Sequence, residues 1–409
     1  RRHNHGGGGE DESWQQPVVE VRALEASWQD AEGKMQYRFR SQAEHRLLHL
    51  VREEPPAPAA GPRPLSMRFP LGASVVCVAR DSEAFGQTGV VERTGNEAAG
   101  VEARFEIGLS RAERDALQLE VQQIVARQHA SLKWYELADV AKRAQLDVHV
   151  TRQVLGSLMA RCADKVREDI GMNLVSEGKG EAPTLCLPCY SVKSVGRWKF
   201  SDLAVDALRD YHQRFPGIFE LLRKRHSEDR DLEVRYAFPT SRDTDYDCRQ
   251  LVKYVTGCAF KKLRLAPPQY MALAPPGIAE VARAVDRAHA RAADRQQTEL
   301  VRGSRRLYRA EDAGSKPPAE LQPQEDVVVG QRGIHARAGG LVPCGARGTV
   351  VGVYGAGAQQ EVELLLDEDS FGASDLYGRA PAMRGVLLPA AAFLPLGPRF
   401  EAAAAAEPA

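Results

Sequence analysis

Long hydrophobic runs are missing from this sequence. No stretch of apolar residues approaches the roughly 18–20 that a membrane-spanning helix needs, and there is neither a secretory signal nor an initiator Met. Charge of one sign is missing too, because 55 Lys and Arg face 55 Asp and Glu and the formal net charge is +0 at pH 7. These absences argue against a membrane protein and against a protein whose whole surface binds nucleic acid. They still allow a local basic patch.

Common catalytic motifs are also missing. The sequence contains no Walker A loop, no nucleophile elbow and no H-E-x-x-H motif. The glycine-rich stretch Gly352–Gly357 has the wrong spacing for a dinucleotide loop, and strand sequence follows where a helix should begin. We interpret it as a hairpin turn. The ten histidines do not cluster beyond His3 and His5.

Cysteine is sparse. Seven residues, an odd number scattered over 409 positions, fit a reducing cytosolic setting better than a disulfide framework. Only Cys186 and Cys189 have the spacing of metal ligands, and a zinc site would need two more. Cys162 and His212 are the only candidates nearby. We favour two thiols in a strand or wing over a zinc site, and expect no catalytic residue and no metal in this chain.

What is present is material for several domains. A length of 409 residues, 43% hydrophobic and 27% charged, predicts two to four globular domains with more than one core. The sequence starts with a polar, glycine-rich segment and ends in polyalanine. We expect it to be a fragment of a longer protein.

One pattern occurs twice, about 260 positions apart. An apolar strand at 71–78 leads through Gly86 and Gly89 into a second β-branched strand, and a strand at 327–332 leads in the same way through Gly345 and Gly348. Glycines at such corners supply positive φ or close backbone approach, while Val and Thr supply the strands. The doubled pattern predicts two small, strongly bent β-barrels, which usually bind or brace other molecules.

The rest of the chain can be divided by composition and periodicity. Strand alternation around Gly33, the Pro55-Pro56 pair and the helical periodicity after Ser110 set the first boundaries. We expect a disordered lead at 1–13, the remnant of a β domain at 14–52, a linker at 53–64, a first small barrel at 65–109, a helical domain at 110–300, a linker at 301–325, a second barrel at 326–397 and a disordered tail at 398–409.

Several helix boundaries are marked by individual residues. Ser110 with Glu113 predicts a capped helix start, and Ser201 predicts another. Pro216 should interrupt the helix that follows Ser201, and a long amphipathic helix is expected over 278–300. Two short helices around a tight turn near Gln145 indicate a helix-turn-helix. The second offers only Arg152 and Gln153 as polar readers, so we expect it to pack against protein and not to read DNA.

With its elements in the order barrel, helix-turn-helix, strand with a Trp followed by a helix broken at Pro, and second barrel, the chain resembles a known family. It is similar to the region carboxyl-terminal to the nuclease core of the cytoplasmic 5′→3′ exoribonucleases of the Xrn family. Four stretches carry the resemblance: 65–69 with 85–91, like that family's KOW-like barrel; 170–174 with 198–201 and 211–219, like its winged-helix domain; 344–353, like the start of its SH3-like domain; and 364–369 with 384–393, like the end of that domain.

The resemblance implies a multidomain α+β chain in which two small SH3/KOW-like β-barrels flank a winged-helix-like α/β domain. It implies a non-catalytic module that packs against the nuclease core, holds its amino-terminal segment and shapes the substrate entrance. Processive hydrolysis of 5′-monophosphorylated RNA would take place in that core, where clustered acids bind Mg²⁺; no cofactor is implied here. The implied setting is cytoplasmic RNA and mRNA decay, with RNA and decay or decapping factors as partners and no membrane.

The acid-rich stretches of this chain do not match a two-metal site. Such a site needs several convergent carboxylates, whereas Glu228–Asp231 and Asp367–Asp369 fall in expected loops or barrel edges. We expect both to be solvated surface. The stretch 374–379 is irregular relative to the family pattern, so we expect no ligand role for the second barrel.

Three basic groups are candidates for contact with RNA phosphates, although Lys and Arg faces of this kind are usually just solvated. They are Arg197 with Lys199; Lys261 and Lys262 with Arg264; and Arg302 with Arg305, Arg306 and Arg309. Trp198 or Tyr308 beside them is a candidate for stacking on a base.

Two other functions are compatible with the same residues. One is a stand-alone RNA-binding or scaffold protein that kept these accessory domains, which would behave as a compact monomer and not as a fragment with an exposed apolar docking face. The other is a transcription-associated KOW/winged-helix protein. The neutral charge and the poor recognition helix disfavour it.

Overall fold

The computed structural model describes the strands in residues 1–63 by their backbone, and then residues 64–95, 100–161, 166–177, 184–225, 231–293, 295, 297–309, 327–336 and 342–396. The chain divides into two compact units, Arg1–Pro62 and Arg63–Ala409. In the first unit, β2 (Arg22–Gln29) and β3 (Met35–Ser41) form an antiparallel hairpin, and β1 (Val18–Val19) pairs with β4 (His45–Arg46). The lead at 1–13, the tail at 398–409 and nearly all of the linker at 53–64 lie outside the described residues.

The first sheet of the second unit is assembled from two distant parts of the sequence. Its order is β17–β7–β6–β5–β18, and all neighbours are antiparallel. A short helix, α2 (Leu65–Arg68), precedes three consecutive strands, β5 (Ser74–Cys77), β6 (Thr88–Thr94) and β7 (Val101–Ile107). The outer strands β17 (Gln297–Arg302) and β18 (Leu307–Tyr308) come from much later in the chain.

These outer strands correct the predicted organisation. The sequence predicts a helix up to Leu300 and a linker over 301–325, but the helix ends at Ala292 and residues 297–308 complete the first sheet. The signal was weak because β17 is an edge strand in which only Val301 is buried, so it shows no clear alternation. The part of that linker from 310 to 325 lies outside the described residues.

The second sheet has the order β22–β21–β20–β19–β23, with β16 added to β20. Its strands are β19 (Arg332–His335), β20 (Arg347–Tyr354), β21 (Glu361–Leu366), β22 (Gly385–Pro389), β23 (Phe393–Pro395) and β16 (Tyr270–Ala272). Among the described strands, the hydrogen-bonded order of neither sheet closes on itself. The second unit is therefore a mixed α+β structure that contains two large antiparallel sheets.

The doubled glycine pattern has the predicted physical basis in both sheets. Gly86 and Gly345 have φ of 68° and 90°, a conformation that residues with a Cβ rarely adopt. A Cβ on Gly89 or Gly348 would collide with a carbonyl oxygen of the neighbouring strand. Each sheet also has a register shift two to four residues after its second glycine. The repeat therefore encodes the same bent corner twice.

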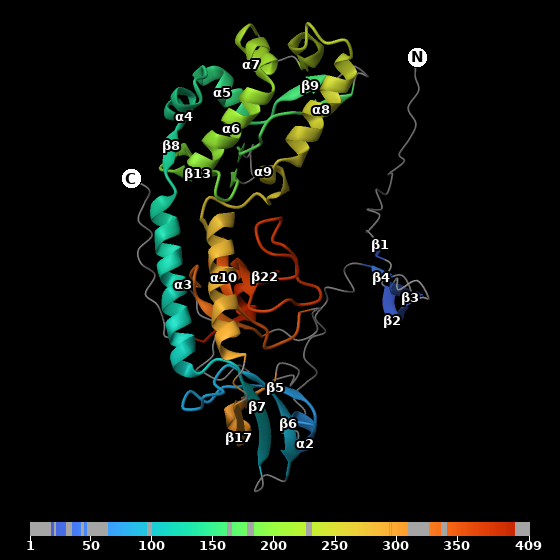
Figure 1. The fold of residues 1–409 in the computed structure, drawn as a ribbon, viewed down its shortest axis with the longest axis vertical. Helices are drawn as coiled ribbons and strands as arrows, with labels where there is room; N and C mark the ends of the chain where they lie inside the picture. Colours follow the sequence, from blue (N-terminus) through green and yellow to red (C-terminus); the bar gives the residue numbers. More distant parts are fainter. Residues whose placement is uncertain are drawn as a thin grey trace, which may run out of the picture. The chain divides into compact units, whose positions relative to one another are not determined.

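A helical region with its own core lies between α3 (Arg111–Ser131) and α10 (Pro275–Ala292) in sequence (Figure 1). Its helices are α4 (Leu137–Ala144), α5 (Val148–Leu155), α6 (Asp202–Arg214), α7 (Pro216–Arg223), α8 (Thr244–Gly257) and α9 (Ala259–Lys262). Its small sheets are β13 (Ser191–Ser194) with β14 (Arg197–Ser201) and β8 (Trp134–Glu136), β9 (Met159–Arg161) with β10 (Arg167–Asp169) and β15 (Leu232–Glu233), and β11 (Val175–Ser176) with β12 (Leu185–Cys186).

The local signals for helix ends are confirmed. Ser110 and Glu113 form a capping box at the start of α3, and Ser201 caps α6. Pro216 separates α6 from α7 by occupying the first turn of the second helix, where its missing N–H costs nothing.

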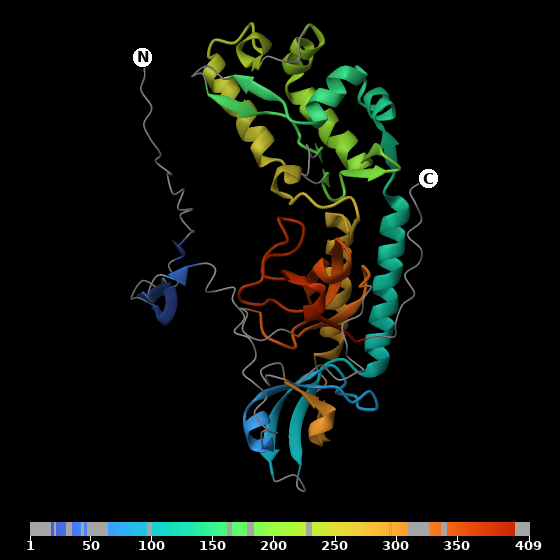
Figure 2. The same ribbon diagram turned by 180° about the vertical axis from the view of Figure 1, so that it is seen from behind.

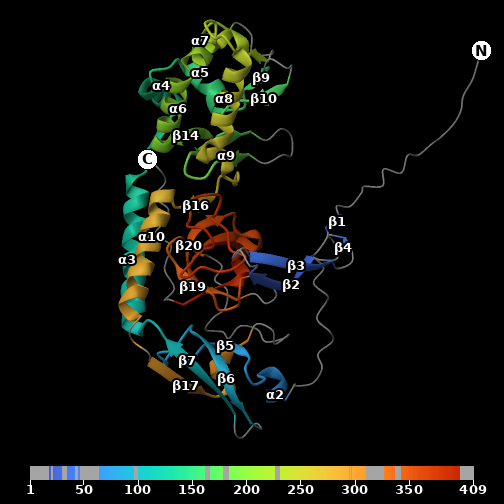
Figure 3. The ribbon, with the colours of Figure 1, turned by 45° about the vertical axis from the view of Figure 1, so that its right-hand side comes forward.

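Helices α3 and α10 form an antiparallel pair that joins the first sheet to the helical region. Two ion pairs connect the helices, Arg127–Glu280 at 2.5 Å and Arg287–Glu120 at 2.7 Å, and a third, Arg295–Glu113 at 2.7 Å, lies just beyond the end of α10. Residue numbers rise along α3 as they fall along α10, which is the register of antiparallel packing. The buried faces of both helices and one face of the second sheet share a single hydrophobic core. Figures 2 and 3 show the second sheet against this pair.

We predict that Gly89→Ala and Gly348→Ala each destabilise the second unit, because the new methyl group must displace backbone in a packed sheet. The expected loss is about 1–3 kcal/mol of unfolding free energy, measured by urea denaturation. Gly108→Ala is the matched control, since a Cβ added there would have nothing within 4 Å and its φ is not positive. Equal stability of all three variants would contradict this account of the corners.

Candidate nucleic-acid interface

The first predicted basic group, Arg197 with Trp198 and Lys199, lies on β14. Arg197 forms an ion pair with Glu136 on β8 at 3.2 Å. The Trp198 indole N–H donates to Glu177 at 2.8 Å, and the Lys193 ammonium lies 5.3 Å from the centre of the Trp198 ring. Lys199 is half-buried. Arg197 and Trp198 therefore already have acidic partners in Glu136 and Glu177. One face of the Trp198 ring, the candidate for stacking on a base, is already in contact with Lys193.

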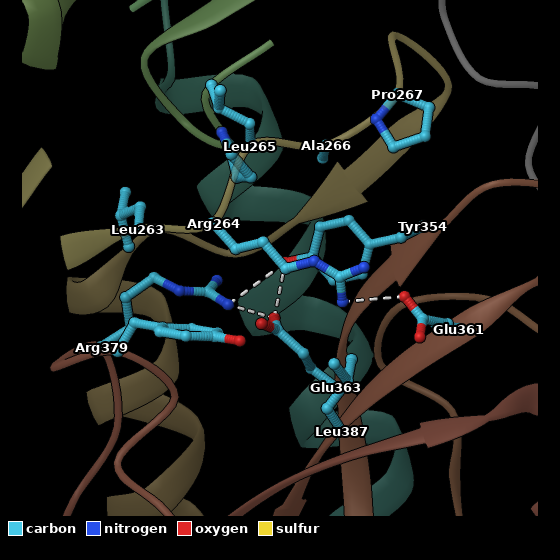
Figure 4. Close-up of a pocket in the computed structure, with 12 residues that line it drawn as sticks. Leu263, Arg264, Leu265, Ala266, Pro267, Tyr354, Glu361, Glu363, Arg379 and Leu387 are labelled. Atoms are coloured by element: carbon cyan, nitrogen blue, oxygen red, sulfur yellow. Dashed lines mark hydrogen bonds and ion pairs between the residues drawn. The ribbon is translucent and has the colours of Figure 1, made fainter. Parts of the chain in front are cut away.

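The second predicted group surrounds the end of α9. Lys261 is half-buried, and burial lowers the pKa of its ammonium group. Lys262 is exposed, and within the described part of the chain its ammonium forms no ion pair. Arg264 donates to Glu361 at 2.9 Å across the edge of a small pocket (Figure 4). Of the three cations, Lys262 is the one most available to a phosphate.

Beneath Arg264, a buried polar network fills the floor of the same pocket (Figure 4). Glu363 accepts hydrogen bonds from the Arg379 guanidinium and from the Tyr354 hydroxyl, the latter at 2.7 Å. Arg379 also donates to the Leu273 carbonyl at 3.3 Å. Both charged side chains are 3% exposed. The irregular stretch 374–379 thus carries an arginine into the interior to neutralise Glu363.

The third predicted group lies around β17 and β18. Arg302 pairs with Glu102 at 2.8 Å, and Arg306 pairs with Asp81 at 2.9 Å. Arg309 donates to the Arg68 carbonyl at 3.1 Å. Arg305 is exposed, and its guanidinium forms no ion pair with a described residue.

The prediction that Tyr308 could stack on a base is wrong. Its side chain is only 7% exposed and packs with Val76, Ile334 and Leu394 in the core between the two sheets. Tyr308 is therefore part of the packing that joins the sheets.

The structure does not bring the three predicted groups together. The β14 and α9 groups belong to the helical region, whereas the β17–β18 group lies at the other end of α3 (Figure 1). A different basic cluster is present that the sequence analysis missed: five arginines line a cavity of about 470 Å³ between α3 and the corners of the two sheets, Arg80, Arg111, Arg114, Arg332 and Arg347. Its members come from four separate segments, so no window of the sequence shows it as a patch.

The two cysteines with metal-like spacing are buried and unreactive in character. Burial raises the pKa of Cys189 to about 12 and also raises that of Cys186, so both thiols stay protonated at neutral pH. The Cys189 thiol lies 3.7 Å from the Ala272 carbonyl oxygen. Cys162 lies outside the described residues. Nowhere in the described part of the chain do three or more His, Cys, Asp or Glu side chains gather as metal ligands would.

The acidic stretch Asp367–Asp369 was expected to be solvated, and this is correct for Glu368 and Asp369 but wrong for Asp367. Asp367 is 7% exposed, and its carboxylate accepts a hydrogen bond from Arg332 and lies 3.6 Å from His289. Burial acts to raise the pKa of Asp367, but the Arg332 charge and these hydrogen bonds outweigh it and hold that pKa well below the usual range. Of the stretch Glu228–Asp231, only Asp231 is described, and it pairs with Arg161 and Arg167.

None of the helices among the described residues is both long enough and apolar enough to cross a bilayer.

Comparison with known families defines the class of protein. Residues 64–303 match the exoribonuclease Xrn1 D2/D3 domain, and residues 325–395 match the Xrn1 SH3-like domain. Since the first match alone covers more than half of the chain, the chain belongs to the Xrn1 5′→3′ exoribonuclease family and contains its D2/D3 and SH3-like domains.

Two individual relatives support this assignment. The chain is 21% identical to 5′-3′ exoribonuclease 1 of Saccharomyces cerevisiae over 348 residues, which are 84% of this chain and 22% of that protein. It is 24% identical to 5′-3′ exoribonuclease 1 of Homo sapiens over 238 residues, which are 56% of this chain and 13% of that protein. The chain thus spans less than a quarter of the length of the curated relatives it matches.

The buried Asp367 predicts how stability depends on pH. Its folded-state pKa is depressed, so the Arg332–Asp367 contact stabilises the fold above the unfolded-state pKa of about 4 and is lost as the pH falls further. Asp367→Asn should cost about 3 kcal/mol at pH 7, because it leaves Arg332 buried without a partner charge. The difference from the unchanged protein should shrink below about pH 4. Urea denaturation at several pH values measures this, with the exposed Glu368→Gln as control.

Proposed function

We propose that this chain is the non-catalytic carboxyl-terminal module of a 5′→3′ exoribonuclease that acts in cytoplasmic mRNA decay. The observation that carries the proposal is the ordered pair of family matches, D2/D3 followed by SH3-like, within a chain that aligns over 84% of its length with 22% of the yeast exoribonuclease. In this role the module packs against the nuclease core and braces the substrate entrance.

The packing of the described residues suits a brace. The chain leaves the first sheet through α3 and returns through α10, so these two helices tie that sheet to the helical region, and the second sheet closes over both helices through a shared core. Such an arrangement resists bending because each contact restrains two elements that are distant in sequence. On this proposal the first sheet, with β17 and β18 included, is a KOW-like domain, the helical region is a winged-helix-like domain and the second sheet is an SH3-like domain.

On this proposal, both catalysis and Mg²⁺ binding belong to a nuclease core outside this chain. A two-metal site needs carboxylates that converge and are free to bind cations. The buried carboxylates described above do not meet this need, because Glu363 is committed to Arg379 and Asp367 to Arg332. We therefore derive no catalytic step from residues of this chain.

The test of the proposal is an activity assay. The purified 409-residue chain should not degrade 5′-phosphorylated RNA in the presence of Mg²⁺, and the open reading frame should continue upstream of Arg1 into an acidic-motif nuclease domain. Degradation of such RNA by the chain alone, abolished by EDTA, would falsify the proposal.

RNA contact by this module is a separate part of the proposal and rests on the exposed cations. Arg305 and Arg306 are adjacent, but Arg306 is paired with Asp81 and Arg305 forms no such pair with a described residue. Arg305→Gln should therefore reduce the salt dependence of single-stranded RNA binding, by about 0.7 in the log–log slope if one phosphate contact is lost. Arg306→Gln should have a smaller effect. Fluorescence anisotropy with a short oligoribonucleotide over several salt concentrations measures both, and identical slopes for the two variants would remove this region from the RNA interface.

The alternative is a stand-alone RNA-binding or scaffold protein that kept the accessory domains. The reading frame distinguishes the two, because a start codon close to Arg1 favours the alternative. Decay or decapping factors remain proposed partners of the first function.

A further inference from the structure

The arginine-lined cavity lies where three parts of the second unit meet. One wall is α3, which contributes Arg111 and Arg114. Another is the turn between β5 and β6, which contributes Arg80 and Phe85. The third is formed by Arg332 and Arg347 of the second sheet. Its volume of about 470 Å³ falls within the range of about 300–1,000 Å³ that is usual for small-molecule sites. The cavity is therefore large enough for a ligand.

The charges around the cavity are unbalanced. Five arginines line it, and Asp115 is the one acid among its lining residues. Arg332 is neutralised by Asp367 behind the cavity wall. Glu83 also acts on Arg114 from nearby. Asp367 and Glu368 also act on Arg347. The described lining itself therefore carries five arginines against one acid, with Asp367, Glu83 and Glu368 acting from nearby.

Arg114 is the most informative of the five. Both terminal nitrogens of its guanidinium are enclosed, and neither has a hydrogen-bond partner among the described residues. Burial lowers the pKa of Arg114, against the smaller opposing effects of Glu83 and Asp115. A guanidinium group cannot lose its charge at neutral pH, so the fold holds several unmade hydrogen-bond donors in a partly dehydrated place. Such groups usually have a partner in the functional state.

Arg347 repeats the situation from the opposite wall. It donates to the carbonyl oxygen of Gly86 at 3.0 Å and so holds the two glycine corners together, but no carboxylate pairs with it among the described residues. Burial first, and then the nearby Arg114 charge, lower the pKa of Arg347 to about 9. The charged form of Arg347 is therefore destabilised mainly by burial and further by Arg114, which Asp367 and Glu368 only partly offset. An anion between Arg114 and Arg347 would stabilise the charge of both.

The other lining residues indicate the rest of the ligand. Phe85 is half-buried, and Leu119 is 56% exposed on the same helix as Arg114. Gln118 is not available, since its amide donates to the Gly330 carbonyl at 2.9 Å and accepts from the Arg332 backbone N–H at 3.1 Å. A cluster of guanidinium donors beside an aromatic and an aliphatic surface suits a group that is doubly charged at one end and flat and apolar at the other.

We propose that this cavity is a binding site for the phosphate group of a nucleotide, with Arg114 and Arg347 as its principal donors and Phe85 as the surface for the base. Phosphate fits better than carboxylate because it presents three or four acceptor oxygens to donors that converge from opposite walls. The same chemistry has two sources, a free nucleotide or the phosphates of an RNA strand. The site needs no nuclease activity and does not depend on the function proposed above.

The binding experiment uses the 409-residue chain and four probes in isothermal titration calorimetry. Adenosine monophosphate carries a phosphomonoester, an oligouridylate with hydroxyl ends carries only phosphodiesters, adenosine carries no phosphate, and hexaglutamate carries only carboxylates. The proposal expects at least one phosphate-bearing probe to bind at least tenfold more tightly than adenosine and hexaglutamate. Preference for the monophosphate assigns a free nucleotide, and preference for the oligomer assigns an RNA strand.

Arg114→Gln tests the site itself, and Arg127→Gln on the same helix is the matched control because Arg127 is exposed and pairs with Glu280. Removing a charge-assisted hydrogen bond should weaken binding of the preferred probe by about tenfold or more, whereas the control should bind unchanged. Thermal unfolding gives a second readout. Without ligand, Arg114→Gln should melt no lower than the unchanged chain, since the terminal nitrogens of Arg114 have no described hydrogen-bond partner to lose, and added ligand should no longer raise its melting temperature.

The proposal is overturned if adenosine or hexaglutamate binds as tightly as the phosphate probes, or if no phosphate probe binds at millimolar concentration. It is also overturned if the two variants bind alike. A lower melting temperature for Arg114→Gln without ligand, combined with unchanged binding, would show that Arg114 has only a structural role.

Discussion

The antiparallel contact between α3 and α10 is the constraint on which the rest of the second unit depends. Helix α3 carries the chain from the first sheet to the helical region, and α10 carries it back, so their packing places β17 and β18 beside β7 and β5. At about 1.5 Å per residue, the 21 residues of α3 span roughly 31 Å. The D2/D3 match accordingly runs from residue 64 to residue 303, through both helices and the returning strand β17.

The second sheet depends on that helix pair in turn. Strand β16, directly before α10, extends the second sheet along β20, and Gly330 approaches α3 so closely that a Cβ would lie 2.9 Å from a methyl carbon of Val125. Arg347 then reaches the Gly86 carbonyl of the first sheet. The SH3-like match is therefore separate in sequence but not in packing, because it shares one core with α3 and α10.

Features set by neighbouring residues could be predicted from the sequence, and features set by distant contacts could not. The capping box at Ser110, the break at Pro216 and the two glycine corners follow from local backbone chemistry, and each is present. The burial of Tyr308 and of Asp367 depends on elements that the sequence cannot place beside them. Edge strand β17 was mistaken for helix and linker for the same reason, since its partner β7 lies about 190 residues earlier. The family resemblance succeeded because it summed weak local signals in a fixed order.

The candidate site shows the same difference between features set by neighbouring residues and features set by distant contacts. The predicted basic groups were contiguous in sequence, and four of their nine cations, Arg197, Arg264, Arg302 and Arg306, form ion pairs with acids, because adjacent charges on one surface are easily balanced there. The cavity arginines come from four segments of the chain and converge where α3, the β5–β6 turn and the second sheet meet. A carboxylate added at this point would have to fit the packing of all three elements. A ligand that bound there would restrain segment 80–85, α3 and the second sheet together. By linkage, each tenfold excess of free ligand over its dissociation constant would add about 1.4 kcal/mol to the stability of the whole junction. The unbalanced charge is therefore better understood as a property of the junction than of any one of its domains.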